Sequence, residues 1–142
     1  MTAPTPLPPV APVAHTQAIR VYWEDTDAGG IVFYANYLKF FERARTEWLR
    51  TLGVHQQQLR ETTGAIFVVS DTAVKYHRSA RLDDLLSVTV QVAEAGRASM
   101  RLTQQALRDG ELLAEGDIRI GCVDAGTLRP RRIPTEILER IA

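Results

Sequence analysis

Cysteine is nearly absent from the 142-residue chain, which contains only Cys122 and therefore cannot form an intramolecular disulfide. Such cysteine usage fits a reducing compartment, so a cytoplasmic location is expected. Cys122 lies in the largely apolar run 118–123. A lone cysteine in such a run is usually a small buried hydrophobe, so a thiol nucleophile is not expected there.

Net charge and long apolar runs are absent as well. The 17 basic and 17 acidic side chains cancel, which argues against a nucleic-acid binder, because such proteins present a basic face to phosphates. Arg129, Arg131 and Arg132 form a local basic cluster that we assign to a solvated loop. No apolar stretch approaches the ~20 residues that span a bilayer, so no transmembrane segment is expected.

The first residues lack the features of a secretory signal. Residues 1–12 carry five prolines and no basic side chain, whereas a signal needs a basic start and a continuous apolar helix. Proline removes backbone donors and blocks helix formation. We therefore predict an extended, mobile tail over residues 1–15, followed by a single domain over residues 16–142 that is long enough to bury one core.

A strand and a long helix are predicted next. Alternating apolar residues indicate a strand over 16–24. Residues 34–52 carry a broad aromatic stripe at helical spacing, with charged residues in the gaps. Gly53 is suited to end this helix, because glycine adopts the left-handed conformation without steric cost. A shorter helix is predicted over 55–62.

The second half of the chain has the pattern of strands. Asp109 and Gly110 separate two β-like runs, which is a strong hairpin signal. A short helix is predicted over 135–141. The four predicted strands are 66–76, 86–93, 99–107 and 111–123. Together with the first strand and the long helix they predict an α+β fold, with one helix packed on one antiparallel sheet whose open edges favour dimerisation.

A turn rich in acids and glycines precedes the long helix. Residues 25–30 read Asp-Thr-Asp-Ala-Gly-Gly. A helix start carries unpaired N–H groups and roughly half a positive charge, which can bind the oxyanion formed when a carbonyl is attacked. Gly29 and Gly30 allow a ligand to approach the backbone closely. One segment can therefore supply both a carboxylate nucleophile or base and an oxyanion site.

Two other interpretations of this turn stay open on residue chemistry alone. An aspartate before a helix is commonly a helix cap, worth ~1 kcal/mol to stability. Oxygen-rich side chains also suit Ca²⁺ or Mg²⁺, although the turn lacks the spaced ligands of a calcium loop. His15, His55 and His77 have no i, i+4 spacing and no paired cysteines, so no metal site is predicted. Serine-hydrolase, P-loop and dinucleotide-binding motifs are absent too.

At these residues the sequence resembles a known family. Residues 21–50, VYWEDTDAGGIVFYANYLKFFERARTEWLR, are similar to the signature of the Tol–Pal-associated acyl-CoA thioesterases and of the 4-hydroxybenzoyl-CoA thioesterase group of the hotdog superfamily. Residues 76–84 match the same family. The resemblance implies a hotdog fold, a five-stranded antiparallel sheet wrapped around one long central helix. It also implies hydrolysis of acyl-CoA to CoA and a carboxylic acid, without a metal or bound cofactor, at the dimer interface of a homodimer or homotetramer.

The resemblance assigns roles to residues of the turn. Asp27 matches the family's catalytic aspartate, acting either as a nucleophile or as a base that activates water. The backbone N–H of Tyr34 falls where the family polarises the thioester carbonyl. Gly29 and Gly30 match the glycines of the turn and are assigned to substrate binding. Many Tol–Pal-associated members have a histidine where this chain has Tyr34, so no imidazole acid or base is expected there.

Substrate contacts further along the chain are implied as well. Arg97 and Ser99 lie where related enzymes contact the phosphates of CoA, often across the dimer.

Two alternative functions stay open. A hotdog hydratase or dehydratase would want a histidine close after Asp27, and none follows before His55. A non-catalytic protein that binds acyl-CoA or acyl carrier protein would have no need of a carboxylate beside a thioester.

The remaining polar residues of the second matching segment have structural interpretations. His77 is expected to be a strand or interface residue rather than a catalyst. Asp83 and Asp84 are expected to structure a loop, and Asp83 is placed to pair with Arg81.

Overall fold

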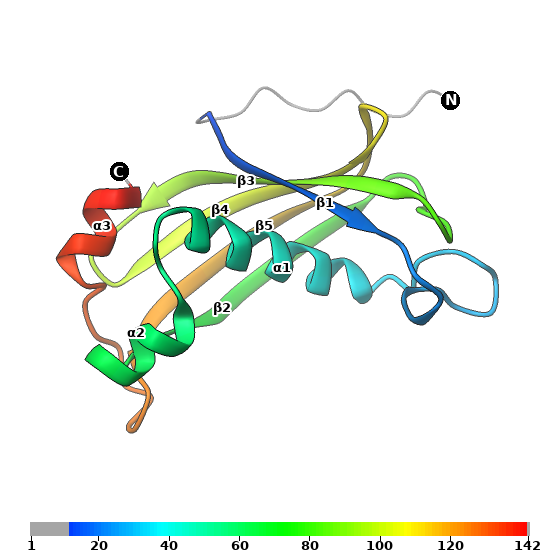
Figure 1. Cartoon of the computed structure of the whole chain (residues 1–142). Helices are drawn as coiled ribbons and strands as arrows, with labels where there is room; N and C mark the ends of the chain where they lie inside the picture. Colours follow the sequence, from blue (N-terminus) through cyan, green and yellow to red (C-terminus); the bar gives the residue numbers. More distant parts are fainter. Residues whose placement is uncertain (1–11, 142) are drawn as a thin grey trace.

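The long helix α1, Asn36–Thr51, lies along one face of a single curved sheet (Figure 1). The structure, a computed structural model, describes residues 12–141. The sheet has the strand order β1-β3-β4-β5-β2, and every neighbouring pair is antiparallel. Its strands are β1 Val13–Arg20, β2 Ala65–Tyr76, β3 Leu85–Ala95, β4 Ser99–Arg108 and β5 Glu111–Asp124. The predicted α+β fold is confirmed.

The core forms where the apolar stripe of α1 meets the sheet. Phe40 and Phe41 are fully buried, and α1 packs mainly on β1 and β3. Gly116 of β5 permits this close approach, because a Cβ there would lie 3.0 Å from the Phe41 ring. The buried residues of α1 are Tyr37, Phe40, Phe41, Ala44, Trp48 and Leu49.

The boundaries of the first strand differ from the prediction, because hydrogen-bonded pairing with another strand sets them and the side-chain pattern does not. The first strand begins at Val13, because Val13 already pairs with Gln91 of β3. It ends at Arg20 and is followed by the short 3₁₀ helix η1, Trp23–Asp25. Of the predicted tail, residues 1–11 lie outside the described residues, and residues 13–15 belong to β1.

The hairpin and the smaller helices follow the sequence signals. Asp109 and Gly110 have φ of 51° and 80°, as expected of a two-residue hairpin turn. Helix α2 spans Gln56–Thr63, and α3 spans Thr135–Ile141. Within residues 12–141, no helix is long and apolar enough to cross a membrane.

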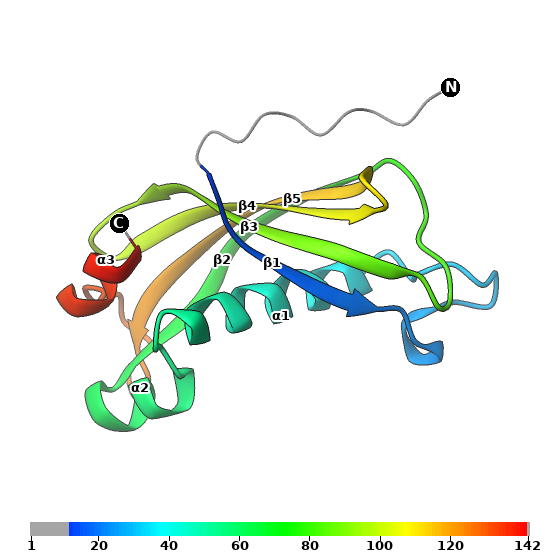
Figure 2. The ribbon, with the colours of Figure 1, turned by 45° about the horizontal axis from the view of Figure 1, so that its top comes forward.

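The two ends of α1 face different surroundings. Figure 2 shows α2 and α3 at the end where α1 finishes, while the loop that leads into α1 lies at the other end of the sheet. Residues 34 and 35, predicted as helical, belong to this loop, and α1 begins at Asn36. The acidic turn is therefore separated from α2 and α3 by the length of the helix, about 24 Å for 16 residues.

Candidate active site

Asp27 occupies a tight turn whose backbone folds around its own side chain. Its N–H donates to the Ile31 carbonyl at 2.8 Å, and the Gly30 N–H donates to its carbonyl at 3.0 Å. The Gly29 N–H donates to Asp27 Oδ1 at 2.8 Å. Within residues 12–141, Asp27 Oδ2 has no donor, and the side chain is exposed. One carboxylate oxygen therefore orients the group while the other stays available.

The two glycines of the turn serve different purposes. A Cβ on Gly29 would lie 3.2 Å from Asp27 Oδ1, so this glycine leaves room for the carboxylate. Gly30 has a φ of 80°, which side-chain-bearing residues adopt at a cost, and a Cβ there would meet nothing within 4 Å. A glycine at position 29 leaves space for the Asp27 carboxylate, and a glycine at position 30 allows the positive φ of the turn.

Asp25, two residues earlier, is a structural anchor. It is buried, and its Oδ2 accepts the Tyr22 N–H at 2.8 Å. Its carbonyl accepts the Phe33 N–H and the Asn36 Nδ2, both at 2.9 Å. These bonds tie both arms of the turn to the start of α1, and they leave Asp27 as the exposed acid.

The start of α1 has no side-chain cap. Its N-cap residue is Ala35, and the first turn contains no acidic residue. Among residues 12–141, the Tyr34 N–H has no hydrogen-bond acceptor. The interpretation of Asp27 as a cap of this helix is therefore wrong. The helix start keeps free donors and the positive end of its dipole.

A groove of about 350 Å³ joins Asp27 to three tyrosines. The Tyr76 hydroxyl donates to the Tyr34 carbonyl at 3.0 Å, and the Tyr37 hydroxyl accepts the Ala80 N–H at 3.1 Å. Burial raises the pKa of Tyr37 and that of Tyr76 above the ordinary value of a tyrosine, so both remain neutral hydroxyls near neutral pH. Tyr37 belongs to the aromatic stripe of residues 34–52, whereas no local pattern singles out Tyr76, because only folding brings strand β2 beside the helix start.

His77 also lines the groove, but the Nε2 atom of its ring faces Glu115. This Nε2 is buried, has no hydrogen-bond partner among residues 12–141, and lies 3.5 Å from the Glu115 carboxylate. Glu115 pairs with Lys75 in the sheet, and Tyr76 pairs with Ala114. Because directly opposed residues share a face, Glu115 projects from the face opposite to Tyr76. The imidazole next to Glu115 is therefore not positioned as a partner of Asp27.

Arg97 and Ser99 lie at the far end of the sheet from Asp27 within one chain. The Leu85 end of β3 pairs with Arg20, close to the acidic turn, whereas Arg97 follows the opposite end. The ten steps from Leu85 to Ala95 span roughly 33 Å. The Arg97 carbonyl accepts the Ile133 N–H at 2.7 Å, which places it near α3. A single chain therefore does not bring Arg97 or Ser99 to Asp27.

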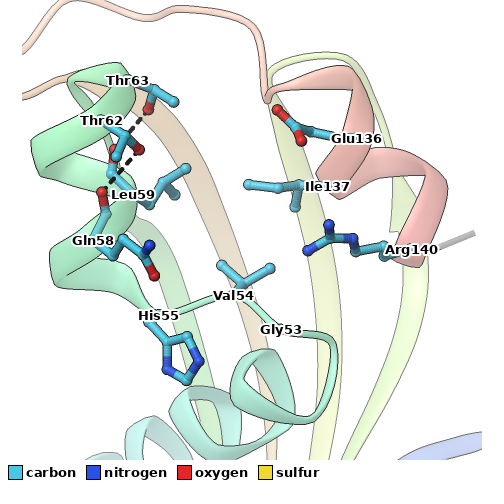
Figure 3. Close-up of a pocket in the computed structure, with 10 residues that line it drawn as sticks. All are labelled: Gly53, Val54, His55, Gln58, Leu59, Thr62, Thr63, Glu136, Ile137 and Arg140. Carbon is cyan, nitrogen blue, oxygen red and sulfur yellow. Dashed lines mark hydrogen bonds between the residues drawn. The ribbon is translucent and has the colours of Figure 1, made fainter.

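A second depression, of about 190 Å³, lies between α2 and α3 (Figure 3). Val54, Leu59 and Ile137 form apolar parts of its wall, and Glu136 and Arg140 extend toward it from α3. None of the residues assigned to catalysis or substrate binding lines it. Within residues 12–141, no group of three or more His, Cys, Asp or Glu residues is arranged to hold a metal ion.

One long helix beneath a single antiparallel sheet, with an exposed carboxylate before the helix, defines a hotdog fold of the thioesterase type. A family model described as the thioesterase-like superfamily matches residues 21–141, and the chain belongs to this superfamily.

Relatives and solved structures agree with this assignment. The chain is 46% identical over 119 residues to the acyl-CoA thioesterase YbgC of Haemophilus influenzae, covering 84% of this chain and 88% of that protein. It is 32% identical over 124 residues to the Helicobacter pylori YbgC, covering 81% and 90%. A probable thioesterase from Bartonella henselae superposes with a TM-score of 0.80 at 32% identity, covering 84% and 98%. A DHNA-CoA thioesterase from Staphylococcus aureus gives 0.83 at 25% identity, covering 89% and 87%.

Proposed function

We propose that the protein hydrolyses the thioester of acyl-CoA to CoA and a free carboxylic acid, with Asp27 as its catalytic carboxylate. The Haemophilus influenzae and Helicobacter pylori relatives are acyl-CoA thioesterases by name, which supports the reaction. One observation carries the residue assignment: among the described residues 12–141, Asp27 Oδ2 accepts no hydrogen bond, and it shares a groove with a helix start that no side chain caps. Thioester hydrolysis needs a group that attacks or activates water, and a donor for the carbonyl oxygen.

The proposed reaction uses the two parts of this groove together. The thioester carbonyl oxygen accepts the Tyr34 N–H, which stabilises the negative charge that develops there. Asp27 then acts in one of two ways. As a nucleophile it attacks the carbonyl carbon, the C–S bond breaks, CoA leaves as the thiolate, and water hydrolyses the mixed anhydride. As a base it takes a proton from a water molecule that attacks the same carbon, after which the C–S bond breaks and CoA leaves as the thiolate, which gives the carboxylic acid directly.

We also propose that two chains join their sheets through β2. This strand is an edge of the sheet, and its Val69 and Tyr76 are 50% and 46% exposed. An open edge of 12 residues with apolar side chains is a template for pairing with another strand. The exposed Phe33 and Tyr34 lie beyond the Tyr76 end of this edge, which extends the apolar surface.

The proposed dimer places Arg97 and Ser99 of one chain near the acidic turn of the other. Antiparallel pairing of two β2 strands places the Ala65 end of one beside the Tyr76 end of the other. The Ala65 end lies next to Asp124 of β5, on the side of the molecule that carries Arg97. In this dimer Arg97 and Ser99 of one chain approach the acidic turn of the other, as binding of the CoA phosphates requires.

The decisive experiment measures release of free thiol from short, long and aromatic acyl-CoAs. We expect Asp27→Asn to keep the fold and lower kcat by at least ~10²-fold, the lower end for a positioned acid or base. Asp117→Asn makes the same chemical change at an exposed residue of β5 that does not line the groove, and it should retain full activity. Near-normal turnover by Asp27→Asn would remove Asp27 from the mechanism. No turnover by wild type on any substrate would favour a binding role, tested next by direct acyl-CoA binding.

A further inference from the structure

The acidic turn is held from outside by a separate segment, residues 79–84. After the turn, the Val32 N–H donates to the Ala80 carbonyl at 2.9 Å, and Ile31 forms a bridge with Arg81. Before the turn, the Val21 N–H donates to the Asp84 carbonyl at 2.9 Å. Both arms of the turn are therefore fixed to the same six residues, and the position of Asp27 depends on how firmly that segment is held.

Two charged residues hold the segment in place. Asp84 Oδ2 accepts the Arg81 N–H and Arg108 Nη1, both at 2.8 Å. The same Nη1 donates to the Ser79 carbonyl at 3.2 Å. One guanidinium on β4 thus binds both ends of the segment. The expected ion pair between Asp83 and Arg81 does not form within the described residues, and Asp84 makes the contact with Arg81 instead.

The pKa shifts of Arg108 and Asp84 both favour the charged forms that make this ion pair. The hydrogen bond to Asp84 raises the pKa of Arg108. Burial acts to raise the pKa of Asp84, but the bonds from Arg108 and the Arg81 N–H outweigh it and keep that pKa below its ordinary value. Neighbouring Asp83 has a φ of 72°, a conformation that persists in a non-glycine residue only where its surroundings enforce it.

We propose that Arg108 and Asp84 are positioning residues for the reaction, and that they set the geometry of Asp27 through residues 79–84. This inference rests on the proposed role of Asp27. Neither side chain lies in the groove, so neither touches the substrate in the proposed complex. Their contribution appears in the chemical step, because a small misplacement of a reacting group can cost up to about 10²-fold in rate.

The test compares Arg108→Ala with Arg101→Ala in the full-length protein. Arg101 lies on the same strand, β4, and makes a contact of similar length, 2.9 Å to Asp117 of β5; its side chain is 31% exposed against 28% for Arg108. We expect Arg108→Ala to lower kcat at least about tenfold with KM changed less than about threefold, and Arg101→Ala to change neither. Arg108→Lys keeps the charge opposite Asp84 and should recover part of kcat. Equal kcat for the two alanine variants would overturn the proposal.

Hydrogen exchange separates this proposal from the function it rests on. The amides of Asp27 and Val32 should exchange faster in Arg108→Ala than in Arg101→Ala, whether or not a substrate has been found. Equal exchange rates in Arg108→Ala and Arg101→Ala would overturn the positioning role. A wild-type protein that hydrolyses no acyl-CoA would count only against the proposed function. If Arg108→Ala does not fold, Asp84→Asn provides the same comparison, because it keeps the side-chain shape and removes the charge.

Discussion

The two ends of α1 are finished in opposite ways. At the start, Ala35 offers no side-chain acceptor, and the Tyr34 N–H has none among residues 12–141. At the finish, Gly53 takes a φ of 79°, and Arg140 of α3 donates to the Leu52 carbonyl at 3.1 Å. One helix end is therefore closed by its neighbours, while the other keeps its donors available.

The start of α1 lacks a stabilising side-chain cap, whereas its end does not lack stabilising contacts. A Ser, Thr, Asp or Asn at the N-cap commonly adds about 0.5–2 kcal/mol. Ala35, with φ of −70° and ψ of −19°, has neither the side chain nor the extended backbone of a capping residue. Departures from such local rules are expected at functional sites. The uncapped start beside Asp27 fits that expectation, and the closed finish beside α3 has the ordinary structural arrangement.

The largest expected effect within this comparison is that of Gly29→Ala. A methyl group 3.2 Å from Asp27 Oδ1 displaces the carboxylate, so we expect kcat to fall about tenfold while the melting temperature barely changes. Gly30→Ala is the matched control. It should lower the free energy of unfolding by about 1 kcal/mol and lower kcat less than Gly29→Ala does, since its φ of 80° is strained but its Cβ meets nothing within 4 Å. Normal turnover by Gly29→Ala would mean that the reaction tolerates a displaced Asp27.

A smaller effect is expected from adding charge at the open end of α1. Ala35→Asp places a carboxylate at the helix start, which stabilises the helix by about 0.3–1 kcal/mol. The same negative charge beside the proposed oxyanion should lower kcat about fivefold, which corresponds to roughly 1 kcal/mol for a repulsion screened by solvent. Ala35→Asn, nearly the same shape without the charge, serves as the control. Denaturant unfolding and steady-state kinetics on both variants test whether stability and activity move in opposite directions.

The smallest effect is expected at the closed end. Arg140→Ala removes the hydrogen bond to Leu52, so the free energy of unfolding should fall by about 0.5–1.5 kcal/mol without a change in kcat. Arg50→Ala removes only an exposed pair with Glu47 at 3.7 Å and should change neither quantity measurably. A kcat effect at Arg140 would show that the two ends of α1 are not independent.

The elements of the fold could be predicted because their signals are local. The aromatic stripe predicted α1, and the Asp109-Gly110 pair predicted the hairpin, since each depends on neighbours in sequence. The start of β1 could not be predicted, because it is set by pairing with Gln91, far along the chain. Asp84, and not Asp83, accepts the Arg81 N–H, and its carboxylate also binds Arg108 of β4, a contact between distant segments that no local pattern reports.

The site was predictable in part. The turn stood out by composition, but sequence gives Asp25 and Asp27 the same chemistry. Burial distinguishes them, since Asp25 is enclosed and bonded while Asp27 is exposed. Tyr76 joins the groove only through the folding of β2 beside α1, so no pattern near the turn reports it. The catalytic role of Asp27 stays a prediction that the thiol-release measurement tests.

The open edge of β2 has a consequence for how activity depends on dilution. In the proposed dimer the acidic turn comes from one chain and Arg97 from the other, so a separated chain holds only half of each CoA-binding site. Two-fold symmetry makes the two sites equivalent, and dissociation disables both at once. By mass action, specific activity then follows the fraction of paired chains, and the concentration of the enzyme itself acts as an effector of its turnover.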